Sequence, residues 1–323
     1  FEIPFPWTPT HGPQQQFLIF QFQKKIVTNI IMNNRKEKAV VVLCGGGSGC
    51  VTNIICDRLM RKSEEYFLIV AGRTPMPPRD EKSIDFIHFD IFEQNAGENL
   101  INEINKLIGT KGIACGVQNK VSAVINSIST GGKISYDTTK IAYLNYVSVN
   151  FMVNLAKSLN CALVHMSSLK VGQPENFDPT QLESEPAWRG ARSPYAWSKL
   201  AAELKLLNSD LQDMSLIRIG LLDSLHAKKF YTRVRVVCDF PVTITEEKDL
   251  QNTIEKAIHA KGRHIVTVEH HVESNLQFYR RMSNRWMLLQ FPVWLFNFVF
   301  GNLLPTKMID YVSPTHDFRY KLF

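Results

Sequence analysis

A run of glycines near residue 45 constrains the fold of this chain more than any other feature. It lies in Leu43-Cys-Gly-Gly-Gly-Ser-Gly-Cys-Val-Thr52. The apolar, β-branched run from Ala39 to Leu43 precedes it, and a stretch with helical spacing, Val51 to Lys62, follows it. Glycine permits the positive φ of a tight turn, and a backbone without Cβ can approach a pyrophosphate at the positive end of a helix. The strand–turn–helix context therefore predicts a dinucleotide site.

Four residues of this loop are the predicted contacts to the dinucleotide. Gly46, Gly49 and Thr52 fall in the GxxGxxG register, with threonine in the third place, and Ser48 lies between the first two. The alternative is a glycine-rich turn that binds nothing. Because Thr52 has a side chain where the pattern has its third glycine, we expect it to crowd the packing of the helix on the sheet.

Strands and helices alternate along the following two hundred residues. We predict strands at 67–71, 84–89, 122–125, 162–166 and 215–219, and helices at 100–108, 141–159 and 195–207. Buried strands joined by helices of this length form right-handed βαβ units. The predicted fold class is α/β, a doubly wound parallel Rossmann sheet. It spans 39–225, between an N-terminal extension or docking arm at 1–38 and a smaller C-terminal portion at 226–323.

Composition narrows the choice of partners. The 323 residues are 45% hydrophobic and 21% charged, as in an ordinary globular protein. The net charge is +7, but no run of five basic residues occurs, which argues against nucleic-acid binding. The six cysteines form no CxxC pair and the nine histidines no HxxxH or HExxH spacing, so the sequence predicts no metal site and reduced thiols.

The residues after the next two strands indicate which cofactor would bind. Arg73 stands near the end of the second strand, where an acidic residue would bond a ribose 2′-hydroxyl. An arginine there suits a 2′-phosphate, so NADP(H) is favoured over NAD(H). Asp90, after the third strand, is placed to accept a hydrogen bond from an adenine amine, or to cap a helix.

A third motif carries the predicted chemistry. Tyr195 and Lys199 are four residues apart, on one face of a helix, so the ammonium group would lower the pKa of the phenol. Such a tyrosine can exchange a proton with a substrate oxygen while a hydride moves to or from a nicotinamide. Ser167 and Ser168 end a strand upstream, where a hydroxyl could polarise the same oxygen.

With these motifs in place, the chain resembles an extended short-chain dehydrogenase/reductase of the NAD(P)-dependent epimerase/dehydratase type, from about Ala39 to about Gly262. The residues that carry the resemblance are Gly46–Thr52, Arg73, Asp90, Asn150, Ser168, Tyr195, Lys199 and Leu216–Ile219. It implies that Tyr195 is the general acid/base, that Lys199 binds the nicotinamide ribose, and that Ser168 orients the substrate oxygen. It also implies a cofactor contact at Asn150, a helix at Ile244–Ile258 and a strand at Gly262–Val268.

A second function is compatible with the same motifs. The prolines near the N-terminus, the basic pI and the uncharged stretch Trp286–Leu304 suit an accessory subunit of a large mitochondrial membrane complex. Such a subunit would hold NADP(H) without turnover, and the chain distantly resembles the dehydrogenase-like accessory subunit of respiratory complex I. Residues 1–38 and 286–304 would then contact other subunits on the matrix side. A free enzyme would instead be a homodimer, mitochondrial or cytoplasmic. Trp286–Leu304 reads as a packed helix, a surface contact or a membrane span.

Overall fold

The fold is organised around one parallel sheet. The computed structural model describes residues 37–47, 49–75, 84–115, 117–129, 138–171, 194–231, 236–238, 241–283 and 289–291. Within them, seven strands pair in the order β10-β6-β5-β4-β1-β2-β3, all parallel. The strands are β1 (Lys38–Cys44), β2 (Tyr66–Gly72), β3 (Ile84–His88), β4 (Val117–Asn126), β5 (Ala162–Ser168), β6 (Met214–Ile219) and β10 (Arg263–Thr267). The predicted doubly wound α/β fold is confirmed.

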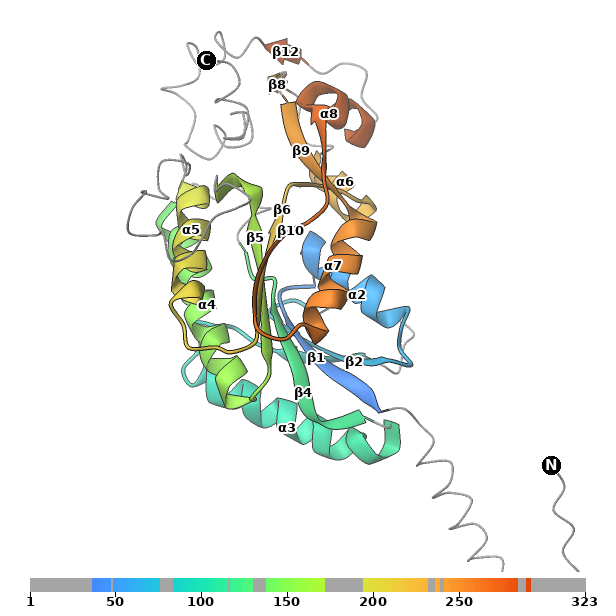
Figure 1. Ribbon diagram of the computed structural model, residues 1–323, viewed down its shortest axis with the longest axis vertical. Coiled ribbons are helices and arrows are strands. Elements are labelled where there is room, and N and C mark those ends of the chain that lie inside the picture. The colour runs from blue at the N-terminus through green and yellow to red at the C-terminus, as the bar shows by residue number, and fades with distance from the viewer. Residues whose placement is uncertain are drawn as a thin grey trace, which may run out of the picture.

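Helices cover both faces of this sheet (Figure 1). One face carries α2 (Cys50–Met60) and α7 (Glu247–His259), and the other carries α3 (Ala96–Cys115), α4 (Thr138–Ser158) and α5 (Pro194–Leu207). Side chains of β1 alternate between the two cores, and every one from Val40 to Cys44 is fully buried. A central strand of a parallel sheet has no polar face, which is why its sequence is a continuous apolar run.

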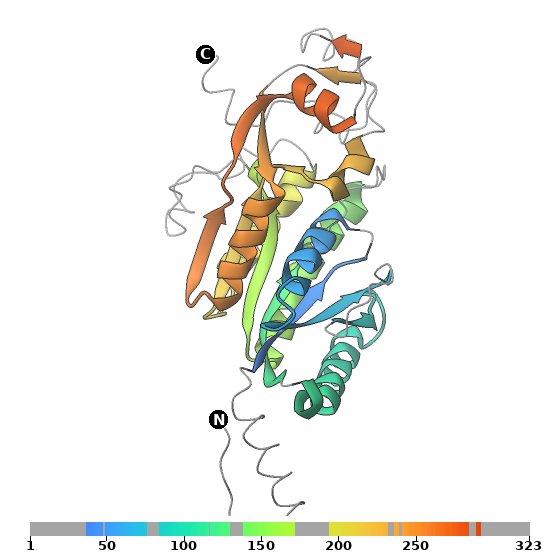
Figure 2. The ribbon, with the colours of Figure 1, turned by 90° about the vertical axis from the view of Figure 1, so that its right-hand side faces the viewer.

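A smaller unit lies beyond the carboxyl ends of the sheet strands (Figures 1 and 2). It contains a three-stranded sheet of order β11-β9-β7 and a two-stranded pair, β12 with β8. Its elements are β7 (Leu221–Asp223), α6 (Leu225–Tyr231), β8 (Val236–Cys238), β9 (Pro241–Glu246), β11 (His271–Ser274), α8 (Asn275–Ser283) and β12 (Leu289–Phe291). A short 3-10 turn, η1 (Leu169–Val171), follows β5.

Part of the predicted C-terminal portion, 226–323, joins the large sheet. Strand β10 pairs with β6 at the edge of the large sheet, and α7 packs on that sheet's core. The helix predicted at Ile244–Ile258 begins only at Glu247, because Ile244–Glu246 ends β9. The alternating β-branched sequence Val-Thr-Ile-Thr pairs with β7 and β11 and thereby takes these residues into a sheet.

Two predicted docking segments fall largely outside the described residues. Of 1–38, only Glu37 and Lys38 are described, and Lys38 begins β1. Of Trp286–Leu304, only Leu289–Phe291 is described, and it is a strand rather than part of a helix. Among the described residues, no helix has the length and apolarity that crossing a membrane requires.

Candidate functional site

The glycine loop lies where the sheet reverses its order, between β1 and β4. In doubly wound folds, ligands bind in the crevice at the carboxyl ends of such strands. The Gly47 N–H donates to the Thr74 carbonyl (2.9 Å), and the Gly49 N–H donates to the Gly46 carbonyl (2.8 Å). The loop after β1 is thereby fixed to the loop after β2. Ser48, also predicted to contact the cofactor, is outside the described residues.

The first turn of α2 suits an anion. Gly49 is its N-cap, with no side-chain cap hydrogen bond and no acidic residue in the first turn. The Asn53 amide donates to the carbonyls of Gly47 (2.9 Å) and Gly49 (2.8 Å), which ties the loop to the first turn of the helix. Uncapped N–H groups and the helix dipole favour a phosphate there. These residues therefore fit a dinucleotide.

Thr52 is accommodated by a hydroxyl pair that sequence reasoning missed. Thr52 is buried, and its Oγ1 lies 2.9 Å from the Ser127 Oγ, which itself donates to the Cys44 carbonyl (3.0 Å). A Cβ built on Gly45 would lie 2.1 Å from the Ser127 Oγ and 2.6 Å from the Thr52 Oγ1. The space beside the loop is therefore filled by these hydroxyls, which would have to shift to admit a side chain at Gly45. The polar sequence after β4 was the available signal.

Arg73 and Asp90 lie next to each other at the ends of β2 and β3. The Arg73 Nη1 is 3.9 Å from the Asp90 Oδ2, and the Arg73 side chain is 68% exposed. An exposed pair this long contributes little to stability, so the guanidinium is available to an anion. Asp90 does not cap α3, which begins six residues later. It accepts the Phe92 N–H (3.1 Å) and closes a turn.

Lys199 is buried at the carboxyl end of β5. It is only 3% exposed, and its Nζ donates to the Met166 carbonyl (2.9 Å). Burial lowers the pKa of the Lys199 ammonium to about 8, and the Glu203 carboxylate opposes that shift. Ser168 is the last residue of β5 and is also buried. Tyr195 lies one helical turn before Lys199 in α5; its side chain is outside the described part.

An ion pair beneath Lys199 was not predicted from the sequence. The Glu203 carboxylate accepts hydrogen bonds from the Arg218 Nε (3.0 Å), the Arg218 Nη2 (2.6 Å) and the Ser167 hydroxyl (2.5 Å). Two signals existed: Glu203 follows Lys199 by four residues, and Arg218 interrupts an apolar strand. The pair holds β5, β6 and α5 together below the predicted catalytic residues.

A second buried polar network involves His165, another residue that the sequence did not single out. The Asn126 amide N–H contacts the His165 Nδ1 (3.1 Å) and reaches the Ser148 Oγ (3.5 Å). Since the Asn126 group donates, a neutral His165 carries its proton on Nε2. Burial, with the Lys199 charge, holds the pKa of His165 well below its usual value. In the described part of the chain, the His165 Nε2 has no hydrogen-bond partner.

Asn150 is placed apart from the other predicted contacts. It is exposed on α4, whereas Asn145 and Ser148 of the same helix are buried. The Asn145 amide donates to the Ser198 hydroxyl of α5 (2.8 Å). The structure therefore brings Asn145 and Ser148, rather than Asn150, into the polar network behind the site.

A glycine loop at the switch point and a buried lysine beside the end of β5 define a dinucleotide-binding Rossmann protein. The model of the NAD dependent epimerase/dehydratase family matches residues 42–219. Since that is more than half of the chain, the protein belongs to this family of NAD(P)-dependent oxidoreductases and epimerases. No curated protein sequence matches the chain significantly.

Solved structures of similar fold include enzymes that are named for nucleotide-linked sugars. The dTDP-glucose 4,6-dehydratase of Bacillus anthracis, in complex with NAD, has a TM-score of 0.56 at 13% identity, over 76% of this chain and 80% of its own. The UDP-glucose 4-epimerase of Thermotoga maritima also has a TM-score of 0.56 at 13% identity, over 78% of this chain and 85% of its own. The ADP-L-glycero-D-manno-heptose-6-epimerase of Helicobacter pylori has a TM-score of 0.58 at 13% identity, over 79% of this chain and 85% of its own. At these identities the likeness establishes the fold.

Proposed function

We propose that the protein is an oxidoreductase or epimerase that acts at a carbinol or carbonyl carbon through Ser168, Tyr195 and Lys199. The observation that carries the proposal is the burial of Lys199 beside the carboxyl end of β5, one turn after Tyr195 and near Ser168. A lysine is buried at a cost, and here its Nζ has a single described acceptor, the Met166 carbonyl.

Each residue of the set has a separate role in this proposal. The Tyr195 phenol exchanges a proton with the substrate oxygen, and the Ser168 hydroxyl donates a hydrogen bond to that oxygen. The Lys199 ammonium stabilises the Tyr195 phenolate and donates to the ribose of the cofactor. A bound nicotinamide supplies hydride transfer. With a pKa of about 8, Lys199 is charged at neutral pH and can perform this role.

We further propose that the cofactor is NADP(H), with Arg73 on the 2′-phosphate. The exposed Arg73 guanidinium and the absence of an acid at the end of β2 support this preference. The solved enzyme from Bacillus anthracis holds NAD, so the proposal distinguishes this chain from that relative.

We propose a nucleotide-linked sugar as the substrate class, on the strength of the enzymes that share the fold. The competing proposal is a noncatalytic subunit of a mitochondrial membrane complex that holds NADP(H) at the same site. It places residues 1–38 and 286–304 against other subunits on the matrix side, whereas the enzyme would be a free homodimer.

Steady-state turnover separates the two proposals. The full chain, purified with NADPH or NADP⁺, is assayed against a panel of nucleotide sugars, alongside Tyr195→Phe and Ser168→Ala. The enzyme proposal predicts turnover by the unaltered protein and its loss in Tyr195→Phe, by a factor of about 100 or more, with NADPH affinity kept. Tight NADPH binding without turnover on any substrate, together with migration in a very large complex, would favour the subunit.

A further inference from the structure

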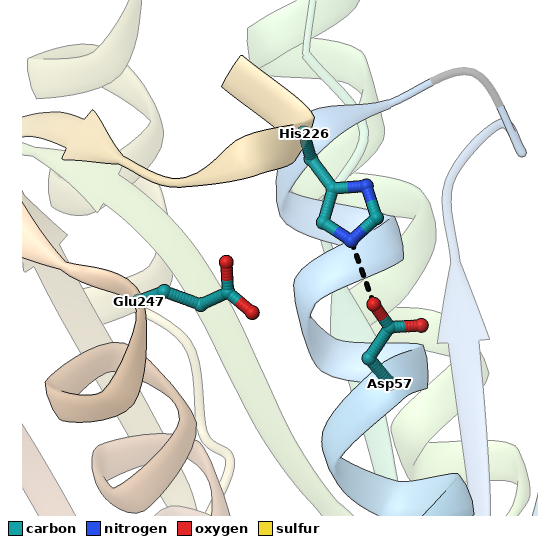
Figure 3. A group of neighbouring side chains, drawn as sticks. All are labelled: Asp57, His226 and Glu247. Atoms are coloured by element: carbon teal, nitrogen blue, oxygen red, sulfur yellow. Dashed lines mark hydrogen bonds and ion pairs between the residues drawn. The ribbon is translucent and has the colours of Figure 1, made fainter. Parts of the chain in front are cut away.

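Three side chains from α2, α6 and α7 converge on one another (Figure 3). They are Asp57 in α2, His226 in α6 and Glu247 at the start of α7. One ligand atom from each lies within 4.8 Å of the other two, and all three residues are half-buried. The His226 Nε2 and the Asp57 Oδ2 are 2.6 Å apart. We propose that this cluster, named here the Asp57–His226–Glu247 site, binds Zn²⁺ or a divalent metal ion with similar ligand preferences.

The donor atoms favour that class of ion. One imidazole nitrogen with two carboxylate oxygens is a set that Zn²⁺ accepts, whereas Mg²⁺ and Ca²⁺ take oxygen ligands alone. Ligands about 2.1 Å from a tetrahedral ion lie about 3.4 Å from one another. The contact between Asp57 and His226 would therefore open slightly and the Glu247 carboxylate would move inward. Side-chain rotations supply movements of this size, and water would complete the coordination.

The surrounding charges also favour a cation. The Gln251 amide donates to the Glu247 Oε1 (3.0 Å), which orients the carboxylate as an outer partner of a metal ligand does. Arg58, the cation next to Asp57 in the sequence, is directed instead to Glu255 (2.7 Å). No lysine or arginine of the described ranges forms an ion pair with Glu247. Two carboxylates therefore lie beside one imidazole, and both would attract a dication.

The position of the site indicates a structural role. Helix α2 begins at the glycine loop, α6 follows β7 of the smaller unit, and α7 leads into β10 of the large sheet. An ion at the Asp57–His226–Glu247 site would join these three segments through coordinate bonds. The inference does not depend on the proposed catalysis, because the site shares no residue with Ser168, Tyr195 and Lys199. Its three ligands are too far apart in sequence to give a spacing motif.

Zinc titration of variants tests the site. The full chain, stripped by a chelator and dialysed, is titrated with Zn²⁺ in competition with a chromophoric chelator. Asp57→Asn and His226→Gln remove one ligand each. His271→Gln is the matched control, because His271 also faces two carboxylates. Its Nδ1 is 4.0 Å from Glu246 and its Nε2 is 3.9 Å from Glu273, so the two contacts diverge and cannot share one ion.

The proposal predicts one equivalent bound by the unaltered protein and by His271→Gln. Affinity should fall at least about 100-fold in Asp57→Asn and His226→Gln, since a direct ligand matters no less than an outer one. Circular dichroism checks that each variant is folded. If either fails to fold, Glu247→Gln replaces it. Co²⁺ loaded into the unaltered protein should then give the intense visible d–d bands of a four- or five-coordinate ion, whereas Co²⁺ free in water gives weak ones. No binding by the unaltered protein, or binding kept in the ligand variants, would overturn the site.

Discussion

Arg218 and Glu203 form a two-point ion pair inside the protein, below the end of β5. The guanidinium Nε and Nη2 lie 3.0 Å and 2.6 Å from the two carboxylate oxygens, and the side chains are 4% and 0% exposed. The same carboxylate influences Lys199, one turn earlier in α5. The charge that supports the predicted catalytic lysine is therefore fixed in place by the neighbouring strand.

Breaking this pair from one side should destabilise the protein strongly. Arg218→Met leaves the Glu203 carboxylate buried without its cation, and we expect a loss of about 3–5 kcal/mol in the free energy of unfolding. Arg218→Met with Glu203→Leu removes both charges and should recover much of that loss. Urea denaturation measures both. A double variant no more stable than the single one would contradict this account of the pair.

Lys199 should make stability depend on pH in a defined window. Its pKa is about 8 in the folded chain, below the ordinary lysine value of 10.5. Between these values the unfolded chain binds more protons, so the free energy of unfolding rises with pH. The gain is about 3 kcal/mol across the window, by the conversion of 1.36 kcal/mol per pKa unit. Denaturation at pH 8 and pH 10 measures this rise, which should be smaller in Lys199→Met than in the unaltered protein. An equal rise in the two proteins would exclude the pKa shift of Lys199.

The glycine loop should not tolerate a methyl group at Gly45. In Gly45→Ala the new Cβ would meet the Ser127 and Thr52 hydroxyls, so we expect a loss of about 1–3 kcal/mol from overpacking, and weaker NADPH binding. Gly109→Ala is the matched control, because nothing lies within 4 Å of a Cβ on this exposed helical glycine. That change should stabilise the chain by about 0.5–1 kcal/mol. Equal thermal shifts in the two variants would contradict the close packing around Gly45.

Arg73 should set the cofactor preference. A charge-assisted hydrogen bond between Arg73 and the 2′-phosphate is worth about 1.5–3 kcal/mol. Because Arg73→Ala loses this bond, the variant should bind NADPH about 10–150-fold more weakly and NADH with unchanged affinity. Arg61→Ala removes an equal charge at the opposite end of α2 and should alter neither affinity. Fluorescence titration with both nucleotides measures the ratio. An unchanged ratio in Arg73→Ala would rule out the contact to a 2′-phosphate.

The large sheet could be predicted from the sequence because its strands are buried on both faces and therefore read as apolar runs between helices. Strand β9 and its boundary with α7 were missed, because Ile244 continues both an alternating pattern and a helical one. The contribution of β10 to the large sheet was missed for a different reason. Its pairing with β6 depends on a crossover that returns from the smaller unit, which local periodicity does not encode.

The candidate site divides in the same way. The loop glycines, Arg73, Ser168 and the Tyr195–Lys199 spacing are local patterns, so the sequence alone displays them; their roles in the site stay predictions. Glu203 with Arg218, and Asn126 with His165, are contacts between segments, and only the tertiary packing brings them together. Thr52 appeared as a departure from the glycine pattern. The structure explains it through a hydroxyl 75 residues away in sequence, on Ser127.

In the proposed reaction, Tyr195 moves a proton while the bound nicotinamide changes its oxidation state. The most direct measurement is rapid mixing of the NADP⁺-loaded protein with nucleotide sugars, followed by the near-ultraviolet absorbance of reduced nicotinamide. We predict a transient rise in the unaltered protein, for at least one sugar nucleotide, and none in Tyr195→Phe with the same cofactor occupancy. An identical rise in Tyr195→Phe, or no rise with any sugar nucleotide in the unaltered protein, would contradict the account.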